Sequence, residues 1–135
     1  VPEKYTKIFN IVRDARDAAV DFLQQSFAAN KTVRGCDVDD VSRKHIEQHG
    51  YGEFFIHRTG HSITEDLHGS GANMDNLETR DERIIIPETS FSIEPGIYFM
   101  GDFGIRSELN VYVSKNYEVI VPGEPRQQEV VAILK

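Results

Sequence analysis

The chain has 135 residues, of which 39% are hydrophobic and 10% aromatic, a composition typical of one globular domain with its own core. Its 22 acidic and 15 basic residues give a net charge of -7, and there is no basic run of the kind that binds nucleic acid or a membrane surface. No apolar run approaches the roughly 20 residues that span a bilayer, so we expect neither nucleic-acid nor membrane partners. The single Cys36 excludes an internal disulfide and suits a reducing compartment, so we expect a cytoplasmic protein.

Two amphipathic helices are predicted in the first fifty residues. From Pro2 to about Gln25, apolar residues recur three and four positions apart, as on one helix face: Tyr5, Ile8, Phe9, Val12, Ala15, Ala19, Phe22 and Leu23. The opposite face is interpreted as solvated, and its charged residues are Arg13, Asp14, Arg16, Asp17 and Asp21. A second helix is predicted over residues 37–49, with Asp37 or Asp39 as N-cap and Gly50 as the stop. Its inward residues are expected to be Val38, Val41 and Ile46.

Strands are predicted beyond Gly52, where short aromatic or alternating stretches replace the helical pattern. The expected strands cover residues 53–57, 91–94, 97–100, 104–113, 118–121 and 129–134, separated by turns that contain Gly, Pro or Asn. Helices followed by strands are typical of an α+β fold, in which helices cover one face of an antiparallel sheet.

Three of the five histidines, His57, His61 and His68, lie within twelve positions. Two histidines four apart can share one helix face, but Gly60 and the extended run before it indicate a strand entering a loop, and the pattern is not His-Glu-x-x-His. A loop on a rigid scaffold can still bring histidines to a cleft. Spacing alone therefore leaves open a site or a set of surface histidines. His45 and His49, four apart on the second predicted helix, are interpreted as part of a solvated face.

Two glutamates stand among apolar residues of the predicted strands. Glu94 follows Ile93, and Glu108 lies two residues after Arg106, on the same face of its strand. One interpretation is a salt bridge on a solvated sheet face. The other joins Glu94 and Glu108 to His61 as oxygen and nitrogen ligands of Mn, Co, Zn or Fe. Their separations form no local motif, so spacing does not decide between the two.

Taken together, these segments resemble the pita-bread-fold metallopeptidases, specifically the Xaa-Pro aminopeptidase and Xaa-Pro dipeptidase (prolidase) branch. The order, spacing and flanks match in His57...Gly60-His61...Leu67-His68, in Ile93-Glu94-Pro95-Gly96-Ile97-Tyr98 and in Gly104-Ile105-Arg106-Ser107-Glu108. The resemblance covers nearly the whole chain. It implies the C-terminal half of a pita-bread fold, with two helices packed on a curved antiparallel sheet.

The resemblance also implies roles for individual residues. His61, Glu94 and Glu108 would be metal ligands, with Glu108 bridging two ions and Glu94 also moving a proton. His68 would donate a hydrogen bond to the scissile carbonyl as a second catalytic residue. The substrate-binding residues would be His57, which lines the pocket, and Arg106, which orients a carboxylate.

The implied activity is hydrolysis of Xaa-Pro bonds at peptide N-termini, by a water that two divalent ions activate. Mn is the expected metal, with Co, Zn or Fe as alternatives. The implied substrate is a peptide with proline at its second position. Two other functions stay open: a non-catalytic pita-bread binding module, and a metal-independent creatinase-like amidinohydrolase.

The chain departs from the family pattern because the site of the family also needs two aspartates near the first helix. Asp37, Asp39 and Asp40 are interpreted as cap residues and do not substitute for them. We therefore expect residues 1–135 to be the C-terminal portion of a metallopeptidase catalytic domain whose N-terminal portion is absent. Such a fragment would bind at most one metal ion, weakly, and be inactive alone. An unpaired sheet edge would favour a homo-oligomer or complementation by the missing half.

Overall fold

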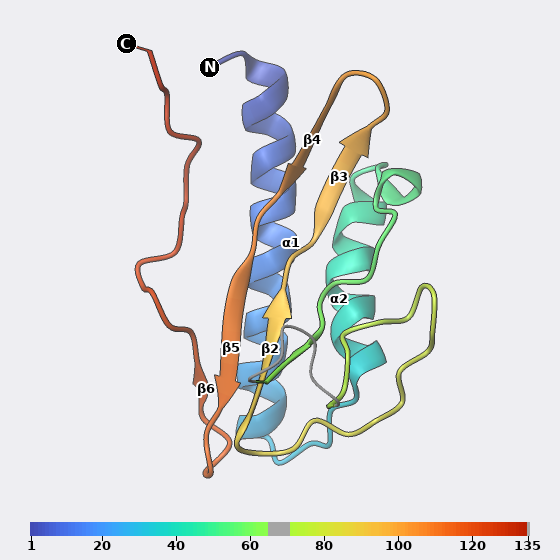
Figure 1. Ribbon diagram of the computed structural model, residues 1–135, viewed down its shortest axis with the longest axis vertical. Coiled ribbons are helices and arrows are strands. Elements are labelled where there is room, and N and C mark those ends of the chain that lie inside the picture. The colour runs from blue at the N-terminus through green and yellow to red at the C-terminus, as the bar shows by residue number, and fades with distance from the viewer. Residues whose placement is uncertain (65–70, 135) are drawn as a thin grey trace.

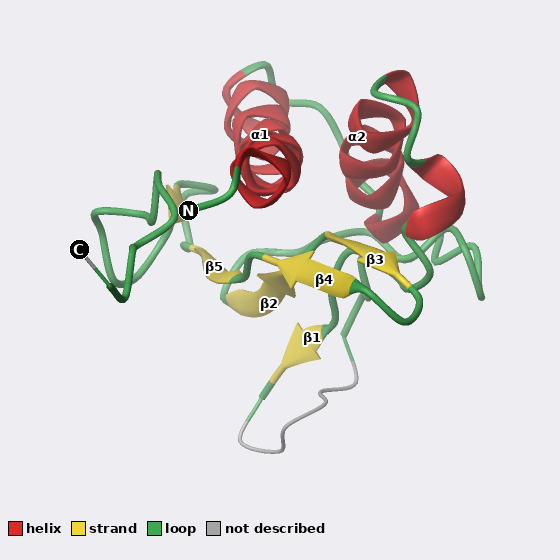
Figure 2. Ribbon diagram, turned by 90° about the horizontal axis from the view of Figure 1, so that it is seen from above, coloured by secondary structure: helices red, strands yellow, loops and turns green. Residues whose placement is uncertain are grey.

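The computed structural model of the chain describes residues 1–64 and 71–134 (Figure 1). Its helices are α1 (Glu3–Ala28), α2 (Gly35–Gln48) and the short 3₁₀ helix η1 (Gly52–Phe54). Its strands are β1 (Ser62–Ile63), β2 (Thr89–Ile93), β3 (Gly96–Phe99), β4 (Phe103–Arg106), β5 (Leu109–Val113) and β6 (Val119–Ile120). Figure 2 shows α1 and α2 side by side on one face of the strands, which confirms the predicted α+β architecture.

Helix α1 forms because its apolar residues repeat with the helical period, and their side chains pack against the sheet as predicted. One residue of the face that we interpreted as solvated is nevertheless buried: Arg16 is only 2% exposed. Its guanidinium donates to Ser107 Oγ at 2.8 Å and to the carbonyl oxygen of Gln127 at 3.0 Å, and it pairs with Asp17 at 2.9 Å. The solvated interpretation is wrong for Arg16 because these partners replace the water that a charged group otherwise requires.

Helix α2 begins earlier than predicted, and its N-cap is Arg34 rather than Asp37 or Asp39. The carboxylate of Asp37 instead accepts a hydrogen bond from the backbone N–H of Arg34 at 2.9 Å, one half of a capping box. Asp39 is fully buried, so its interpretation as a cap residue is wrong. Gly50, with φ +87°, ends the helix as predicted.

The strands form two antiparallel sheets that share one long hairpin. In the first sheet the strand order is β1-β2-β5-β6, and the second consists of β3 and β4. Pro95 lies between β2 and β3, where the two sheets meet. It has no N–H to donate, but its carbonyl oxygen accepts a hydrogen bond from Ser107 N at 3.3 Å. The β2–β5 register pairs Ile93 with Leu109. Continuing that register by one residue places Glu94 opposite Glu108.

Several strand predictions need correction. Residues 53–57 form η1 and irregular structure, residues 129–134 are not a strand, and the predicted strand over 104–113 is divided at Ser107–Glu108. Strand β1 was not predicted, since two residues carry no periodic signal and are extended only because they pair with β2.

Two clusters of buried side chains hold the helices to the strands. The first joins the C-terminal part of α1 to β2 and β5 through residues such as Leu23, Phe91 and Val111. The second joins the N-terminal part of α1 to α2 and β3 through Val12, Ile46 and Ile97, among others. Across residues 1–64 and 71–134, no helix is both long and apolar enough to cross a membrane.

Candidate metal centre

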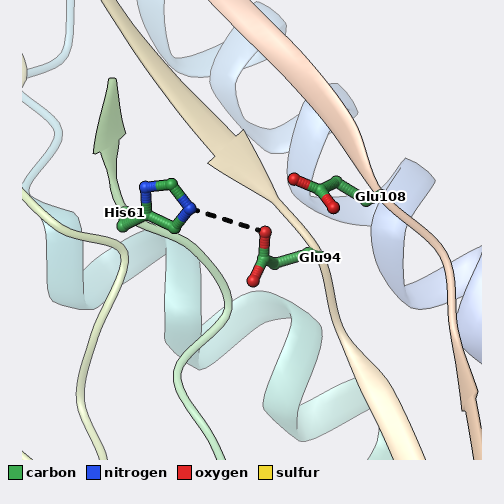
Figure 3. Close-up of side chains that lie close together, drawn as sticks. All are labelled: His61, Glu94 and Glu108. Carbon is green, nitrogen blue, oxygen red and sulfur yellow. Dashed lines mark ion pairs between the residues drawn. The ribbon is translucent and has the colours of Figure 1, made fainter. Parts of the chain in front are cut away.

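His61, Glu94 and Glu108 come together where β1, β2 and β5 meet. One ligand atom from each of them lies within 4.8 Å of the others. His61 Nε2 lies 3.7 Å from Glu94 Oε2, and Figure 3 shows the three side chains directed toward a common space. Three segments that are far apart in the sequence therefore present one imidazole and two carboxylates to a common space.

The alternation of side chains along the hairpin explains why both glutamates reach this space. Ile93 is fully buried in the core under α1, and Ser107 accepts a hydrogen bond from Arg16 of α1. Neighbouring residues on a strand point to opposite faces. Glu94 and Glu108 therefore lie on the sheet face turned away from the helix, and the helices pass behind the side chains in Figure 3.

His61 is oriented by hydrogen bonds from both its backbone and its ring. Its N–H donates to Ser92 Oγ at 3.0 Å, and its carbonyl oxygen accepts from Ser92 N at 2.9 Å. Ring atom Nδ1 lies 3.1 Å from the carbonyl oxygen of Ser62, which can only accept, so Nδ1 carries the proton. In this tautomer Nε2 offers its lone pair on the side of Glu94, as in a metal-binding histidine.

Gly60 allows the segment before His61 to lie directly against β2. A Cβ atom at this position would lie 1.8 Å from the carbonyl oxygen of Ser92. Gly60 also exchanges backbone hydrogen bonds with Met74, at 3.2 and 3.0 Å. Only a residue without a side chain permits this close approach.

Burial is the main cause of the raised pKa of Glu108, and the neighbouring Glu94 raises it further through hydrogen bonding and charge repulsion. The positive charge of Arg106 and the interaction with His61 oppose this shift. Two facing carboxylates and an imidazole are an unfavourable arrangement without a cation, whereas this donor set fits one divalent ion. Three donors are one short of a closed tetrahedral site.

The other predicted site residues lie around this cluster or outside the described residues. His57 donates from Nδ1 to the carbonyl oxygen of Arg58 at 2.7 Å, and its Nε2 lies 2.7 Å from the hydroxyl oxygen of Tyr98. Arg106 is exposed and, with Glu108, borders a cleft of about 460 Å³ beside β5. His68 lies outside the described residues.

Tyr98 was not predicted as a site residue. Its pKa is raised by burial first and by Glu94 as well, whereas the nearby Arg106 lowers it. Its spacing could have indicated a place near the site: Tyr98 follows Glu94 by four positions, so on an extended chain both side chains point to the same face.

The chain is an α+β domain in which one imidazole and two carboxylates form a cluster that could hold a metal ion. The model of metallopeptidase family M24 matches residues 1–115, and the chain belongs to this family. Membership implies divalent metal ions as cofactors. The chain is 36% identical over 106 residues to an Xaa-Pro dipeptidase of Lactobacillus delbrueckii subsp. lactis. The aligned region covers 78% of this chain and 26% of that protein.

Solved structures agree with this assignment. A dipeptidase from Pyrococcus horikoshii OT3 superimposes with a TM-score of 0.74 at 33% identity, over 89% of this chain and 31% of that one. An X-Pro aminopeptidase from Thermotoga maritima MSB8 gives a TM-score of 0.78 at 30% identity, over 96% of this chain and 34% of that one. The resemblance to the Xaa-Pro branch and its pita-bread fold is thus confirmed. The chain spans about a quarter to a third of the length of these relatives.

Proposed function

We propose that this chain takes part in the metal-dependent hydrolysis of Xaa-Pro bonds at peptide N-termini, with His61, Glu94 and Glu108 as metal ligands. The observation that carries the proposal is the convergence of these three donors within 4.8 Å in a chain of family M24. Relatives named as Xaa-Pro dipeptidase and X-Pro aminopeptidase support a peptide with proline at its second position as the substrate.

Bound divalent ions, with Mn²⁺ as the first expectation and Co²⁺, Zn²⁺ or Fe²⁺ as alternatives, supply Lewis acidity and lower the pKa of water toward neutrality. Glu94 accepts the proton that the attacking water loses and delivers it to the leaving amine nitrogen. The carboxylate of Glu108 would help to hold both ions of the complete site. The bond from His61 Nδ1 to Ser62 keeps Nε2 directed at the centre.

The substrate-binding roles fall to residues at the edge of the cluster. His57, held through Tyr98, lines the substrate pocket, and the exposed guanidinium of Arg106 orients a carboxylate. His68 is the proposed donor to the scissile carbonyl, whose developing negative charge a donor stabilises.

We further propose that residues 1–135 are the C-terminal portion of a larger catalytic domain, in a cytoplasmic protein. The partial coverage of the relatives supports the first statement, and the buried, unpaired Cys36 fits the second. With three donors, the chain holds at most one ion, weakly, and is inactive alone. The remaining carboxylates would come from the N-terminal portion of the domain.

The outer edge of β5 is the proposed surface for that portion or for a second copy of the chain. In the described part of the chain, β6 pairs only with Tyr112 and Val113 of β5, so the part of this edge nearer Glu108 has no strand partner. An unpaired edge favours addition of a strand. The cleft of about 460 Å³ lies along the same edge and is lined by Glu108, Arg106 and Arg126, among others.

Calorimetric titration of the chain with Mn²⁺ and Zn²⁺ tests the ligand assignment. We expect weak binding of one ion, lost in His61→Ala and Glu94→Gln. Matched controls are His49→Ala and Glu47→Gln, which change exposed residues of α2 and its C-terminus. Equal affinities in all five proteins would contradict the assignment.

Cleavage of an Xaa-Pro peptide is then measured with and without a separately produced N-terminal portion of the domain. We expect turnover only when both polypeptides and metal are present. A stable complex of the two that binds no metal and cleaves nothing would instead identify a non-catalytic binding module. Turnover that persists after complete removal of metal would favour the creatinase-like alternative.

A further inference from the structure

We infer that the buried Asp39–Arg43 ion pair of α2 is a positioning unit for the metal centre: through Thr59 it fixes the segment that carries His57 and His61. The hydrogen bonds that the ion pair makes to the segment go to Phe55, His57 and Thr59 rather than to the three donors. Its meaning for catalysis rests on the proposed function, whereas its effect on the geometry of the segment can be measured without metal.

The ion pair is bidentate and largely shielded from water. Arg43 Nε donates to Asp39 Oδ2 at 2.9 Å, and Arg43 Nη2 donates to Asp39 Oδ1 at 3.0 Å. The two side chains are 11% and 0% exposed. A bidentate arginine–carboxylate pair fixes orientation as well as distance, because two parallel bonds leave little freedom to rotate.

Asp39 passes this orientation to Thr59. Its Oδ1 accepts hydrogen bonds from Thr59 N at 2.9 Å and from Thr59 Oγ1 at 2.8 Å, and Ser42 Oγ contacts the same hydroxyl. Thr59 is fully buried and lies two residues before His61. Its carbonyl oxygen accepts a hydrogen bond from Glu94 N at 2.6 Å. Thr59 is thus close to His61 along the chain and hydrogen-bonded to the backbone of Glu94, two of the three proposed metal donors.

Arg43 holds the beginning of the same segment. Its Nη1 donates to the carbonyl oxygen of Phe55 at 2.9 Å, and its Nη2 donates to that of His57 at 2.8 Å. The guanidinium also stacks 4.1 Å from the centre of the Phe55 ring, which in turn meets the His57 ring edge-on at 5.2 Å. The contacts continue from His57 to Tyr98, so they connect α2 with the rim of the metal centre.

The segment depends on these side chains because it has no regular secondary structure. Helix η1 ends at Phe54 and β1 begins at Ser62, so the backbone between them lacks a helical or strand ladder for most of its length. A buried ion pair is a costly way to gain stability alone, since apolar residues of similar volume often serve equally well. Its bonds to three positions of one irregular segment match a positioning role.

Arg43→Lys tests the inference because lysine keeps the charge but cannot make the planar set of hydrogen bonds. The control is Arg80→Lys, the same change in an exposed arginine that pairs with Glu82. We expect Arg43→Lys to remain folded by circular dichroism and to bind Mn²⁺ about 10- to 100-fold more weakly, as for partners that orient metal ligands. Thr59→Val, which removes the hydroxyl contacts with Asp39 and Ser42 but keeps the bond from Thr59 N to Asp39, should weaken binding in the same direction. Unchanged affinity in both variants would overturn the inference.

Amide hydrogen exchange and the ring resonances of His57, measured without metal, separate this inference from the proposed function. We expect faster exchange at Thr59 and His61 and a shifted His57 resonance in Arg43→Lys, with no change in Arg80→Lys. If the wild-type chain binds no metal but these changes occur, the metal proposal fails and the positioning role stands. If the segment is unaffected, the positioning role fails whatever the metal affinity. If Arg43→Lys lowers the Tm but leaves hydrogen exchange at these sites and the Mn²⁺ affinity unchanged, the ion pair only stabilises the fold and the positioning role fails.

Discussion

Replacing Gly60 by alanine tests whether the close approach of two backbones sets the geometry of the proposed metal centre. The added Cβ would lie 1.8 Å from the carbonyl oxygen of Ser92, whereas ordinary contact begins near 3.4 Å. The two segments would have to separate by the difference, 1.6 Å. Neither side can yield easily, because the added Cβ is fixed directly to the backbone and the atoms that it meets are the backbone C and O of the fully buried Ser92.

The cost follows from the hydrogen bonds that cross this contact. They join Ser92 N to His61 O at 2.9 Å, His61 N to Ser92 Oγ at 3.0 Å, and Glu94 N to Thr59 O at 2.6 Å. Each contributes about 1 kcal/mol to stability, and overpacking adds about 1–3 kcal/mol. Allowing for partial relaxation, we expect the free energy of unfolding to fall by roughly 3–5 kcal/mol. For a domain of this size, the Tm would then fall by roughly 10–18 °C.

Thermal unfolding followed by circular dichroism measures this loss, and Gly52→Ala is the matched control. The Cβ added in the control would lie 2.6 Å from Glu47 Cγ, which belongs to an exposed side chain that can rotate away. Because Gly60 precedes His61, we also expect Gly60→Ala to lose metal binding below its Tm. A Tm within about 2 °C of wild type, less than the effect of 1 kcal/mol, together with unchanged Mn²⁺ affinity would refute the reasoning.

Two further predictions concern titratable groups. Burial first and His49 second lower the pKa of His45, against the opposing effect of Asp14, and His45 Nε2 is buried without a hydrogen-bond partner. As the pH falls, His45 is therefore protonated at a higher pH in the unfolded chain than in the folded chain. The stability attributable to neutral His45 is complete above the ordinary pKa of about 6.5 and is lost as the pH falls below it. The Tm should fall less between pH 7.5 and 5.5 in His45→Gln than in wild type, and an identical pH dependence would contradict this. Glu108→Gln should raise the Tm of the metal-free chain at pH 7, since it relieves repulsion from Glu94. It should also abolish the rise in Tm that Mn²⁺ causes in wild type. Differential scanning fluorimetry measures both effects, and a lower metal-free Tm in the variant would contradict the prediction.

The helices could be predicted from the sequence because their signal is local. The spacing of apolar residues along α1 and the stop at Gly50 after α2 depend only on the helical period and on the backbone freedom of glycine. Strand predictions were less reliable, because a strand requires a partner. Residues 129–134 have an apolar pattern but no pairing strand, whereas Ser62 and Ile63 have almost no pattern and are extended through pairing with β2.

The candidate metal centre was predicted from a resemblance rather than from spacing. The family motifs singled out His61, Glu94 and Glu108, but nothing local in the sequence requires three such distant residues to meet. Their convergence depends on the register of β2 with β5, and on the close passage of Gly60 along β2. Such long-range pairing is a property of the whole fold.

The sequence by itself determined the residue types of the donors, the two helices and the α+β class, since composition, periodicity and motif order are properties of the chain. Only the tertiary structure decided which charged residues are buried. Arg16 and Asp39 were interpreted as solvated or capping residues, yet both lie in the interior because partners from other segments satisfy their hydrogen bonds. Burial of a charge depends on such partners, and the packing of α1 and α2 against the strands supplies them.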